Sequence, residues 1–316
     1  MEQMGLVSVV MPLYKEELSW VKQCVNSLVN QTYENIEIIV VNDDDQDSLN
    51  VKWVTSLQDS RIRVLQNDHN LGIVGSLNKG MDAARGAYIA RMDADDVACE
   101  DRIEKQLLYL KNHAEVDFVM SGVSFIDGKG KLLSYEQKQL LDFQDVKRRI
   151  QYKSVGHHPT WLMHREAIEL LNGYREVKHV EDLDFILRAI SKNIHIHVMP
   201  ELLLKYRLQS TSLTQQNQLA MYRGAVAVRK SYKNGEIFDS RPEMLSKRTL
   251  SVTQKQKDNF HYFVLARKQA INAMKQQKQI IPMIKYLLAS FGSADKITWF
   301  ARDCQYGFLK VMKLVK

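Results

Sequence analysis

Two clusters of carboxylates have the clearest capacity for chemistry in this 316-residue chain. Asp43-Asp44-Asp45 follows an apolar run at 36–41, and Asp93-Ala94-Asp95-Asp96 follows another at 88–92. Carboxylates this close together repel one another unless a cation or hydrogen-bond donors offset their charge. A hard divalent cation that also bridges two phosphates would do so. For either cluster alone, a solvated acidic turn or the acidic start of a helix is an equally good explanation.

The segments around these clusters follow a βαβ pattern, because short apolar runs alternate with stretches of helical periodicity. This pattern is typical of a mostly parallel sheet covered by helices. Ligands of such open sheets bind outside the carboxyl ends of the strands, where both acidic clusters fall. The predicted strands are Leu6–Met11, Ile36–Val41, Ile62–Leu65, Tyr88–Met92 and Val116–Ser121, and the predicted helices centre on Val21–Leu28, with Ser19 as N-cap, Leu77–Ala84 and Ile103–Leu110.

The pattern of the chain changes twice after residue 121. Asp127–Gly130 predicts a hairpin turn, and further elements are expected as a helix near Val146–Ile150, a strand at Thr160–Met163, a helix at Glu181–Ser191 and a strand at Leu202–Leu208. Beyond about residue 215 only helical patterns remain, with breaks at Pro282 and Gly292. We therefore expect an α/β catalytic domain at 1–215 and a basic α-helical extension at 216–316.

The composition, with 45% hydrophobic and 26% charged residues, is that of a globular protein and excludes a disordered, collagen-like or coiled-coil chain. The net charge of +7 is uneven, since residues 225–316 carry 18 Lys and Arg against six Asp and Glu. Such a segment suits nucleic acid, an anionic membrane surface or an acidic ligand, or is a solvated helical face. Three scattered cysteines favour a reducing compartment, and without a signal-peptide pattern or a long apolar run we expect a cytoplasmic protein.

Six segments, in this order, resemble the inverting nucleotide-sugar glycosyltransferases of family 2, which have the Rossmann-like GT-A fold. Each segment is short, but their shared order and spacing make the resemblance specific, and it covers about residues 5–215. The segments are Val7–Tyr14, Ser27–Tyr33, Glu37–Asp43, Asn70-Leu71-Gly72, Ala84–Asp96 and Glu181-Asp182 with the helix that follows.

The resemblance implies roles for individual residues in a nucleotide-sugar-binding domain. Pro12 and Tyr14 would lie beside the nucleobase, and Asp43 would hydrogen-bond its uracil-like edge. Asp93 and Asp95, with Asp96 beside them, would form the Asp-Xaa-Asp motif that holds Mg²⁺ or Mn²⁺ on the donor diphosphate, with Asp93 also counted among the donor-binding residues. A bound cation offsets the charge that develops on the leaving phosphate.

The resemblance also implies that Asp182 is the general base, with Glu181 as its neighbour. Inversion in one displacement needs a base on the face of the sugar ring opposite to the leaving group, where it deprotonates the acceptor hydroxyl. The alternative is an acidic pair at a helix start, which contributes up to about 1 kcal/mol.

The chain departs from the family pattern at two places. The family usually has Asp-Asp-Gly-Ser after the second strand, whereas Asp44 stands here at the glycine position. Many relatives carry a histidine two residues after the Tyr-Arg of the last strand, and here Tyr206-Arg207 is followed by Leu208 and Gln209. Gln209 can donate a hydrogen bond but is a poor metal ligand, so a histidine ligand is not expected.

Other histidines give weaker indications. His157-His158-Pro159-Thr160 resembles a short element of the family, so that His158, like Arg207, is a candidate contact to phosphate or acceptor, with a purely structural loop histidine as the alternative. His195 and His197 share one face of a strand-like run, but zinc needs further ligands and none is evident.

The combined hypothesis is a metal-dependent inverting glycosyltransferase that moves a sugar from a nucleotide-diphosphate donor, UDP-linked by resemblance, to a hydroxyl. The resemblance further implies synthesis of capsular or other surface polysaccharide on a lipid-linked acceptor. The basic tail would then lie at the inner face of the membrane, unless it packs back on the domain; its residues are Lys296, Trp299, Phe300, Arg302, Phe308, Leu309, Lys310, Lys313 and Lys316.

Three other classes of protein remain open at this level. The basic tail would suit a nucleic-acid-binding protein. However, the sequence contains no recognisable nucleic-acid-binding module, so nucleic acid is not expected as a partner. A nucleotidyltransferase uses a similar metal logic, but it usually has a glycine-rich loop where Pro12-Leu13-Tyr14 stands. An inactive scaffold would not need the acidic residues that the chain retains.

Overall fold

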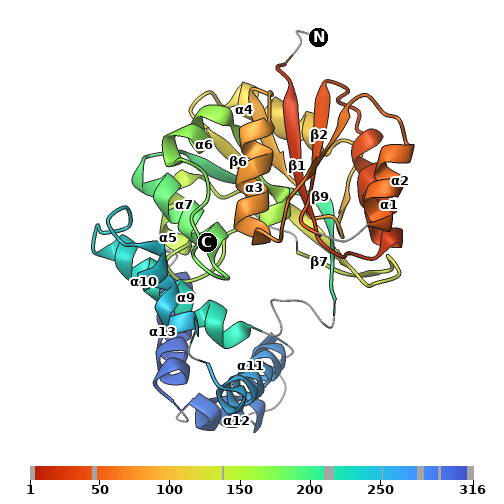
Figure 1. Ribbon diagram of the computed structural model, residues 1–316. Helices are drawn as coiled ribbons and strands as arrows, with labels where there is room; N and C mark the ends of the chain where they lie inside the picture. Colours follow the sequence, from red (N-terminus) through yellow and green to blue (C-terminus); the bar gives the residue numbers. More distant parts are fainter. Residues whose placement is uncertain are drawn as a thin grey trace. The chain divides into compact units, whose positions relative to one another are not determined.

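The structure is a computed structural model that describes residues 4–44, 48–136, 139–209, 217–250, 252–275, 281–290 and 293–311. The chain divides into two compact units. Unit 1 comprises residues 1–147, 154–175 and 184–209, and unit 2 comprises residues 148–153, 176–183 and 210–316. The helix at 181–191, labelled α7 in Figure 1, therefore begins in unit 2 and continues in unit 1.

Unit 1 is built on one twisted sheet with helices on its faces (Figure 1). Within the described residues the sheet has nine strands. Eight of them follow the order β3-β2-β1-β4-β8-β6-β9-β5, and the ninth, β7, pairs with the carboxyl-terminal part of β6. The strands are β1 (Val7–Leu13), β2 (Ile36–Asn42), β3 (Ile62–Gln66), β4 (Tyr88–Arg91), β5 (Val97–Ala98), β6 (Phe118–Ile126), β7 (Leu132–Glu136), β8 (Leu162–His164) and β9 (Ile196–Arg207). The helices are α1 (Leu18–Val29), α2 (Leu49–Ser56), α3 (Gly72–Ala83), α4 (Arg102–Asn112), α5 (Phe143–Arg149), the short 3-10 helix η1 (His158–Thr160), α6 (Arg165–Leu171) and α7 (Glu181–Ser191).

The β3-β2-β1-β4 part of the sheet is parallel, as the βαβ pattern predicts. All seven residues of β2 are buried, which fits a central strand covered on both faces. Gly80 of α3 permits the close packing of that helix, because a Cβ at this position would lie 2.5 Å from Val10 Cγ1. The rest of the sheet is mixed, since β5, β7 and β8 run against the direction of their neighbours.

The chain order reverses between β1 and β4, which lie side by side although β2 follows β1 in sequence. Their ladder ends where Met92 N donates to Val10 O, 3.1 Å away. The next donor on β1 would be Pro12, which has no N–H, so the two strands part at their carboxyl ends. Such a point of reversal is where open α/β sheets bind ligands.

A buried carboxylate ties together the opposite, amino-terminal end of these strands. Glu37 of β2 is 2% exposed, and its Oε1 accepts hydrogen bonds from Ser8 Oγ and from Arg85 N, both at 2.6 Å. Its Oε2 accepts from Arg63 Nη1 at 3.1 Å and from Arg85 Nε at 2.9 Å. Burial alone would raise the pKa of Glu37, but these donors together lower it.

Unit 2 is helical in the residues described, with α9 (Gln218–Lys233), α10 (Pro242–Leu250), α11 (Gln254–Lys275), α12 (Ile281–Ser290) and α13 (Ala294–Val311). Aromatic side chains form its core. Tyr222 of α9 stacks on Trp299 of α13 with ring centres 4.8 Å apart, and Phe260 and Phe263 of α11 pack against the same indole. In the part of the chain that is described, no helix is long and apolar enough to cross a bilayer.

The predicted elements are largely confirmed, with shifted ends. The hairpin turn at Asp127–Gly130 joins β6 and β7, and α7 has the predicted bounds. The last strand begins at Ile196, well before the predicted Leu202. The N-cap prediction is wrong: Glu17 precedes α1, and Ser19 Oγ donates to Glu17 Oε1 instead. Pro282 lies in the first turn of α12, whereas Gly292 lies outside the described residues.

Replacing Glu37 by Gln tests the buried network. Because the folded-state pKa of Glu37 is lowered, its stabilising effect is present above the unfolded-state value and is lost as pH falls through the folded-state pKa. We expect Glu37→Gln to lower the free energy of unfolding at pH 7 by about 1–3 kcal/mol, and the deficit to shrink below about pH 4. Urea denaturation at both pH values measures this, with the exposed Glu34→Gln as control. A deficit independent of pH would contradict it.

Candidate active site

Three carboxylates gather at the carboxyl end of β4, beside the point where the chain order reverses. Asp93, Asp95 and Asp96 lie on the short segment between β4 and β5, and one carboxylate oxygen of each lies within 4.8 Å of those of the other two. Asp96 is 1% exposed, and among the described residues its Oδ2 has no hydrogen-bond partner. Asp43 and Asp44, the described residues of the other acidic cluster, do not belong to this group.

The electrostatics of this acidic group favour a cation. Burial, and after it the charge of Asp93, raise the pKa of Asp95 to about 6, and burial with both neighbours raises the pKa of Asp96 well above its ordinary value. Three hard oxygen ligands and one orphaned carboxylate oxygen form a donor set that fits Mg²⁺ or Mn²⁺. These residues therefore fit the metal that the family resemblance implies.

Buried arginines brace the acidic segment mostly through backbone carbonyls. Arg91, the last residue of β4, is an exception, because its Nη1 lies 2.5 Å from Asp93 Oδ2. Arg102 of α4 is fully buried and donates from Nη2 to Arg91 O at 2.9 Å and to Trp161 O at 3.3 Å. Arg102 belongs to no motif, and a basic residue on an otherwise apolar helix face is its only signal in the sequence.

Arg207, the last residue of β9, has a similar bracing position. Its backbone N donates to Asp96 Oδ1 at 2.8 Å and its Nε to Asp95 O at 2.7 Å. Its Nη1 donates to the carbonyls of Asp127 and Gly128, and its Nη2 to Gln23 Oε1. Four of the five guanidinium N–H groups are thus used within unit 1. The structure thus gives Arg207 a positioning contact to the acidic segment.

Gln209 follows two residues later and touches the acidic group directly. Its Nε2 donates to Asp95 Oδ2 at 2.5 Å. This is the contact expected of a glutamine where many relatives carry histidine, since an amide donates to a carboxylate but binds a metal poorly. The hydrogen bond occupies one oxygen of Asp95, and the carboxylate has a second oxygen with which to accept.

Asp43, at the end of β2, caps a helix. Its Oδ1 accepts from Asn67 Nδ2 at 2.8 Å and from Leu71 N at 2.7 Å, while its Oδ2 accepts from Gly72 N at 2.9 Å. Gly72 begins α3 with a φ of +71°, a value that favours glycine. Asp43 is 4% exposed, and three of the four acceptor positions of its carboxylate are filled.

The loop that lacks the family glycine is held by side-chain amides. Asn42 Nδ2 donates to Asp44 O at 2.9 Å and Gln66 Nε2 to the same oxygen at 3.0 Å. Asp44 is not among the residues with positive φ, so the turn needs no glycine there. Asp45 lies outside the described residues.

The turn after β1 brings Tyr14 and a further acid toward the same end of the sheet. Pro12 is half-buried, Tyr14 is 46% exposed, and Lys15 adopts a φ of +59°. Glu16 Oε2 accepts from Tyr14 N at 2.6 Å. Burial raises the pKa of Glu16 to about 8, and the charges of Asp95 and Asp93 add to the rise. The sequence does not reveal Glu16 as part of the site, because no spacing links it to the acidic group.

His158 lies in the short helix η1, and its side chain contacts other residues of unit 1. Its Nε2 is 2.6 Å from Tyr174 Oη, and its ring lies against Trp161 with centroids 4.4 Å apart. Burial, and then the positive charge of Arg91, lower the pKa of His158 well below its usual value. The imidazole is therefore neutral at pH 7 and lies near the Arg91–Asp93 ion pair.

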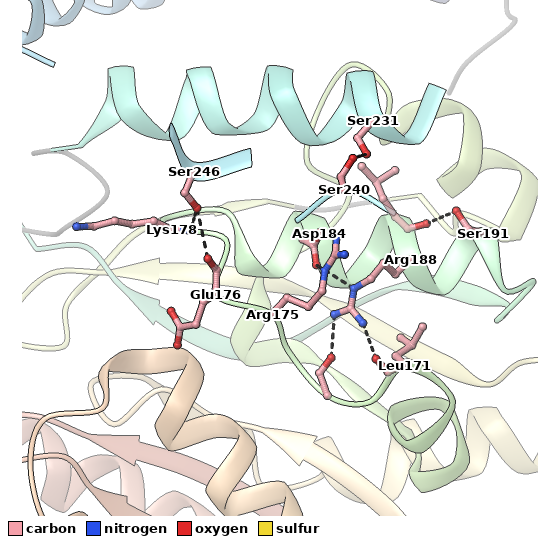
Figure 2. Close-up of polar contacts among 12 residues, drawn as sticks. Leu171, Arg175, Glu176, Lys178, Asp184, Arg188, Ser191, Ser231, Ser240 and Ser246 are labelled. Atoms are coloured by element: carbon pink, nitrogen blue, oxygen red, sulfur yellow. Dashed lines mark hydrogen bonds and ion pairs between the residues drawn. The ribbon is translucent and has the colours of Figure 1, made fainter. Parts of the chain in front are cut away.

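Glu181 and Asp182 form the first turn of α7, the part of that helix that belongs to unit 2. Both are half-buried, and Asp182 Oδ1 accepts from Leu183 N at 2.6 Å. The next turn is fixed in unit 1 by a buried ion network, in which Asp184 pairs with Arg175 and with Arg188 Nε (Figure 2). Arg188 also donates to the carbonyls of Leu171 and Gly173.

His195 and His197, and two aromatic residues of the tail, are held by contacts within the protein. His197 Nδ1 is 2.9 Å from Tyr109 Oη, and His195 stacks on Phe143, so each has a structural partner; in the described residues neither belongs to a metal-binding cluster. Trp299 and Phe300 of the tail are partly buried and pack against the core of unit 2. The side chains of Phe308 and Leu309 are outside the described part of the chain.

Comparison with known proteins agrees with this fold. Residues 8–171 match the family described as "Glycosyl transferase family 2". The chain is 33% identical over 205 residues to an uncharacterized glycosyltransferase, MJ1057, of Methanocaldococcus jannaschii, covering 64% of this chain and 71% of that protein. It is 28% identical to the O-antigen biosynthesis glycosyltransferase WbnJ of Escherichia coli, covering 78% of this chain and 92% of WbnJ.

A solved structure shows the same fold. The chain matches S. aureus TarS 1-349 in complex with UDP, with a TM-score of 0.57, 17% identity, and coverage of 93% of this chain and 80% of that one. The fold is therefore the GT-A type, with a helical C-terminal region. The chain belongs to glycosyl transferase family 2, and it is a glycosyltransferase.

Changing Arg207 to Lys tests the bracing of the acidic segment. A lysine cannot reproduce the guanidinium fork, so several carbonyls lose their donors. We expect the free energy of unfolding to fall by about 1–3 kcal/mol and the affinity for Mn²⁺ to fall with it. Denaturant titration and calorimetric Mn²⁺ titration measure the two effects, with Lys205→Ala on the exposed part of β9 as control. Parent-like values of both quantities for Arg207→Lys would rule out the bracing role.

Proposed function

We propose that this glycosyltransferase moves a sugar from a nucleotide-diphosphate donor, UDP-linked, to an acceptor hydroxyl with inversion and with the help of Mg²⁺ or Mn²⁺. The observation that carries the proposal is the group Asp93, Asp95 and Asp96 at the end of β4, in which one carboxylate oxygen of each residue lies within 4.8 Å of the others. Family membership supports the transferase over a nucleotidyltransferase, a nucleic-acid-binding protein or an inactive scaffold. The similar TarS structure is a complex with UDP, which supports the choice of nucleotide.

In this proposal the donor lies where β1 and β4 part. Tyr14, exposed on the turn after β1, and Pro12 flank the nucleobase. Asp43 offers its one remaining acceptor position to the base edge while its other positions hold the start of α3. Asp95 and Asp93, with Asp96 behind them, hold the cation and diphosphate, and the neutral His158 is a candidate contact to phosphate or acceptor.

The chain's own residues would perform the remaining steps of the reaction. When bound, the cation supplies Lewis-acid neutralisation of the charge that grows on the leaving diphosphate. Asp182 accepts the proton of the acceptor hydroxyl as the hydroxyl oxygen attacks the anomeric carbon of the donor sugar. Glu181 is the neighbour of this base. The ion network of Asp184, Arg175 and Arg188 fixes the part of α7 that belongs to unit 1.

We propose surface polysaccharide synthesis, on a lipid-linked acceptor, as the setting of this reaction. The names of two relatives support it: WbnJ, and the amylovoran biosynthesis glycosyltransferase AmsE of Erwinia amylovora, which is 26% identical. Such an acceptor places the enzyme at the cytoplasmic face of the membrane, and the basic residues of 225–316 would attract an anionic surface.

Donor hydrolysis tests the catalytic proposal. Purified protein is incubated with a panel of nucleotide sugars, with Mn²⁺ or EDTA, and the released nucleoside diphosphate is measured. We expect release from one donor, at least about 100-fold slower in EDTA and in Asp95→Ala, because the offset of the leaving-group charge is lost.

The same assay with acceptor separates the roles of the acids. Asp182→Asn should keep metal-dependent donor binding but lower transfer by at least about 100-fold, because only the proton acceptor is removed. Asp101→Asn, outside the acidic group, is the matched control. If no donor binds in the presence of metal, or Asp95→Ala retains parent activity, the proposal fails.

Flotation with liposomes tests the membrane part of the proposal. We expect the protein to float with vesicles containing anionic lipid at low salt and to stay behind at high salt, about 0.5 M, since screening weakens surface attraction. Neutral vesicles are the control. Equal flotation with both vesicle types, or with neither, would contradict an electrostatic attachment.

A further inference from the structure

Two neighbouring polar side chains in unit 2 each have a buried atom without a hydrogen-bond partner among the described residues. Tyr222 of α9 is 6% exposed, and within the described residues its Oη makes no hydrogen bond; the same holds for Arg302 Nε of α13. The guanidinium carbon of Arg302 lies 5.1 Å from the centre of the Tyr222 ring and 5.4 Å from that of Trp299. A buried hydroxyl and N–H without partners are uncommon in native proteins, and a bound ligand is one way to satisfy them.

Arg229 belongs to the same group. It lies seven residues after Tyr222 on α9, so both side chains extend from one face of the helix. Its Nε donates to Ile150 O at 2.8 Å, which uses one of its five N–H groups. Burial, and next the charge of Arg302, lower the pKa of Arg229 to about 9, so the two guanidinium groups are close enough to repel.

The acids of α13 are engaged by other arginines. Asp303 is bound by Arg267 through Nε at 2.5 Å and Nη2 at 3.0 Å, and also accepts from Tyr286 Oη. Asp295 pairs with Arg223 at 2.9 Å. The acid whose charge acts on Arg229 is Asp182, the candidate general base in the same unit.

We propose that Arg229, Arg302 and the Tyr222 hydroxyl bind a phosphate group of the acceptor. This rests on the proposed function, in which Asp182 receives the proton of the acceptor hydroxyl. Guanidinium groups bind phosphate oxygens through paired N–H bonds, and the Tyr222 hydroxyl adds a neutral donor. The acceptor is then a phosphorylated glycan or lipid, with its phosphate beside Arg229 and its attacking hydroxyl beside Asp182.

Titration with inorganic phosphate tests this site in the full chain. The Asp95→Ala background with EDTA removes the metal-dependent diphosphate site, and calorimetry measures binding. We expect saturable binding that is about tenfold or more weaker in Arg229→Gln and in Arg302→Gln, the scale of one lost charge-assisted hydrogen bond. Lys230→Gln is the matched control, because it removes the same charge from the exposed face of α9.

Variants that keep the positive charge of the two arginines distinguish loss of phosphate binding from loss of folding. Arg229→Lys and Arg302→Lys retain the positive charge but not the planar fork, and should also weaken phosphate binding, with thermal melting as the check on folding. Absent phosphate binding in the parent, or equal binding in the parent and all four arginine variants, overturns the proposal. So does a Lys230→Gln effect as large as theirs, since it would show a diffuse charge effect.

Two further measurements separate the sources of phosphate and the two proposals. Phosphatidic acid in phosphatidylcholine vesicles presents the same phosphate group on a lipid. If these vesicles compete with inorganic phosphate and the competition is lost in Arg302→Gln, the site binds a lipid phosphate. If the vesicles do not compete, the site binds a soluble phosphate. Donor hydrolysis by the parent chain reports the proposed function by itself. Hydrolysis without phosphate binding defeats only this inference, whereas phosphate binding without hydrolysis defeats the assignment to an acceptor together with the proposed function.

Discussion

Repulsion among the carboxylates at the end of β4 is the constraint on which unit 1 depends. Asp93, Asp95 and Asp96 lie close together, the first two half-buried and the third buried, so their charge has to be tolerated by the surrounding protein. The protein could neutralise them with paired arginines, but that would occupy the oxygens. Arg102 and Arg207 instead donate to backbone carbonyls around the segment. The charge of these two guanidinium groups lowers the local repulsion, and neither group occupies a carboxylate oxygen of the acidic segment.

This arrangement explains why so many distant segments meet at one point. Arg207 reaches the acidic segment because β9 pairs in parallel with β6 and ends beside the hairpin turn at Asp127-Gly128. Arg102 reaches it from α4, which begins soon after β5. The segment is therefore fixed by contacts to strands and helices on both sides, as a preorganised site requires. Buried groups such as Asp96 Oδ2 lack a partner among the described residues, which is a common sign that stability is given up for function.

The sequence predicts the parts of unit 1 that follow from local patterns. The buried runs of β1 and β2, the hairpin after β6 and the amphipathic α7 all have a period or a turn signal of their own. The acidic positions follow from strand ends. The neighbours of β8, by contrast, are set by long-range pairing with β4 and β6, which no local pattern encodes. The same limit applies to single side chains: Asp43 is recognisable as a polar residue at a strand end, but its contacts to Asn67, Leu71 and Gly72 depend on how α3 packs on β1 and β2.

The basic composition of the C-terminal third illustrates the difference between charge and its use. In the sequence the 18 basic residues of 225–316 suggest one attractive surface. In the structure some of these basic residues are used within the protein. Arg267, for example, forms an ion pair with Asp303 inside unit 2. Arg302 lies beside the stacked rings of Tyr222 and Trp299, and its Nε is shielded from water. Net charge therefore overstates the surface available to a membrane, and a guanidinium confined by aromatic rings has a more specific capacity to bind an anion than an exposed lysine has.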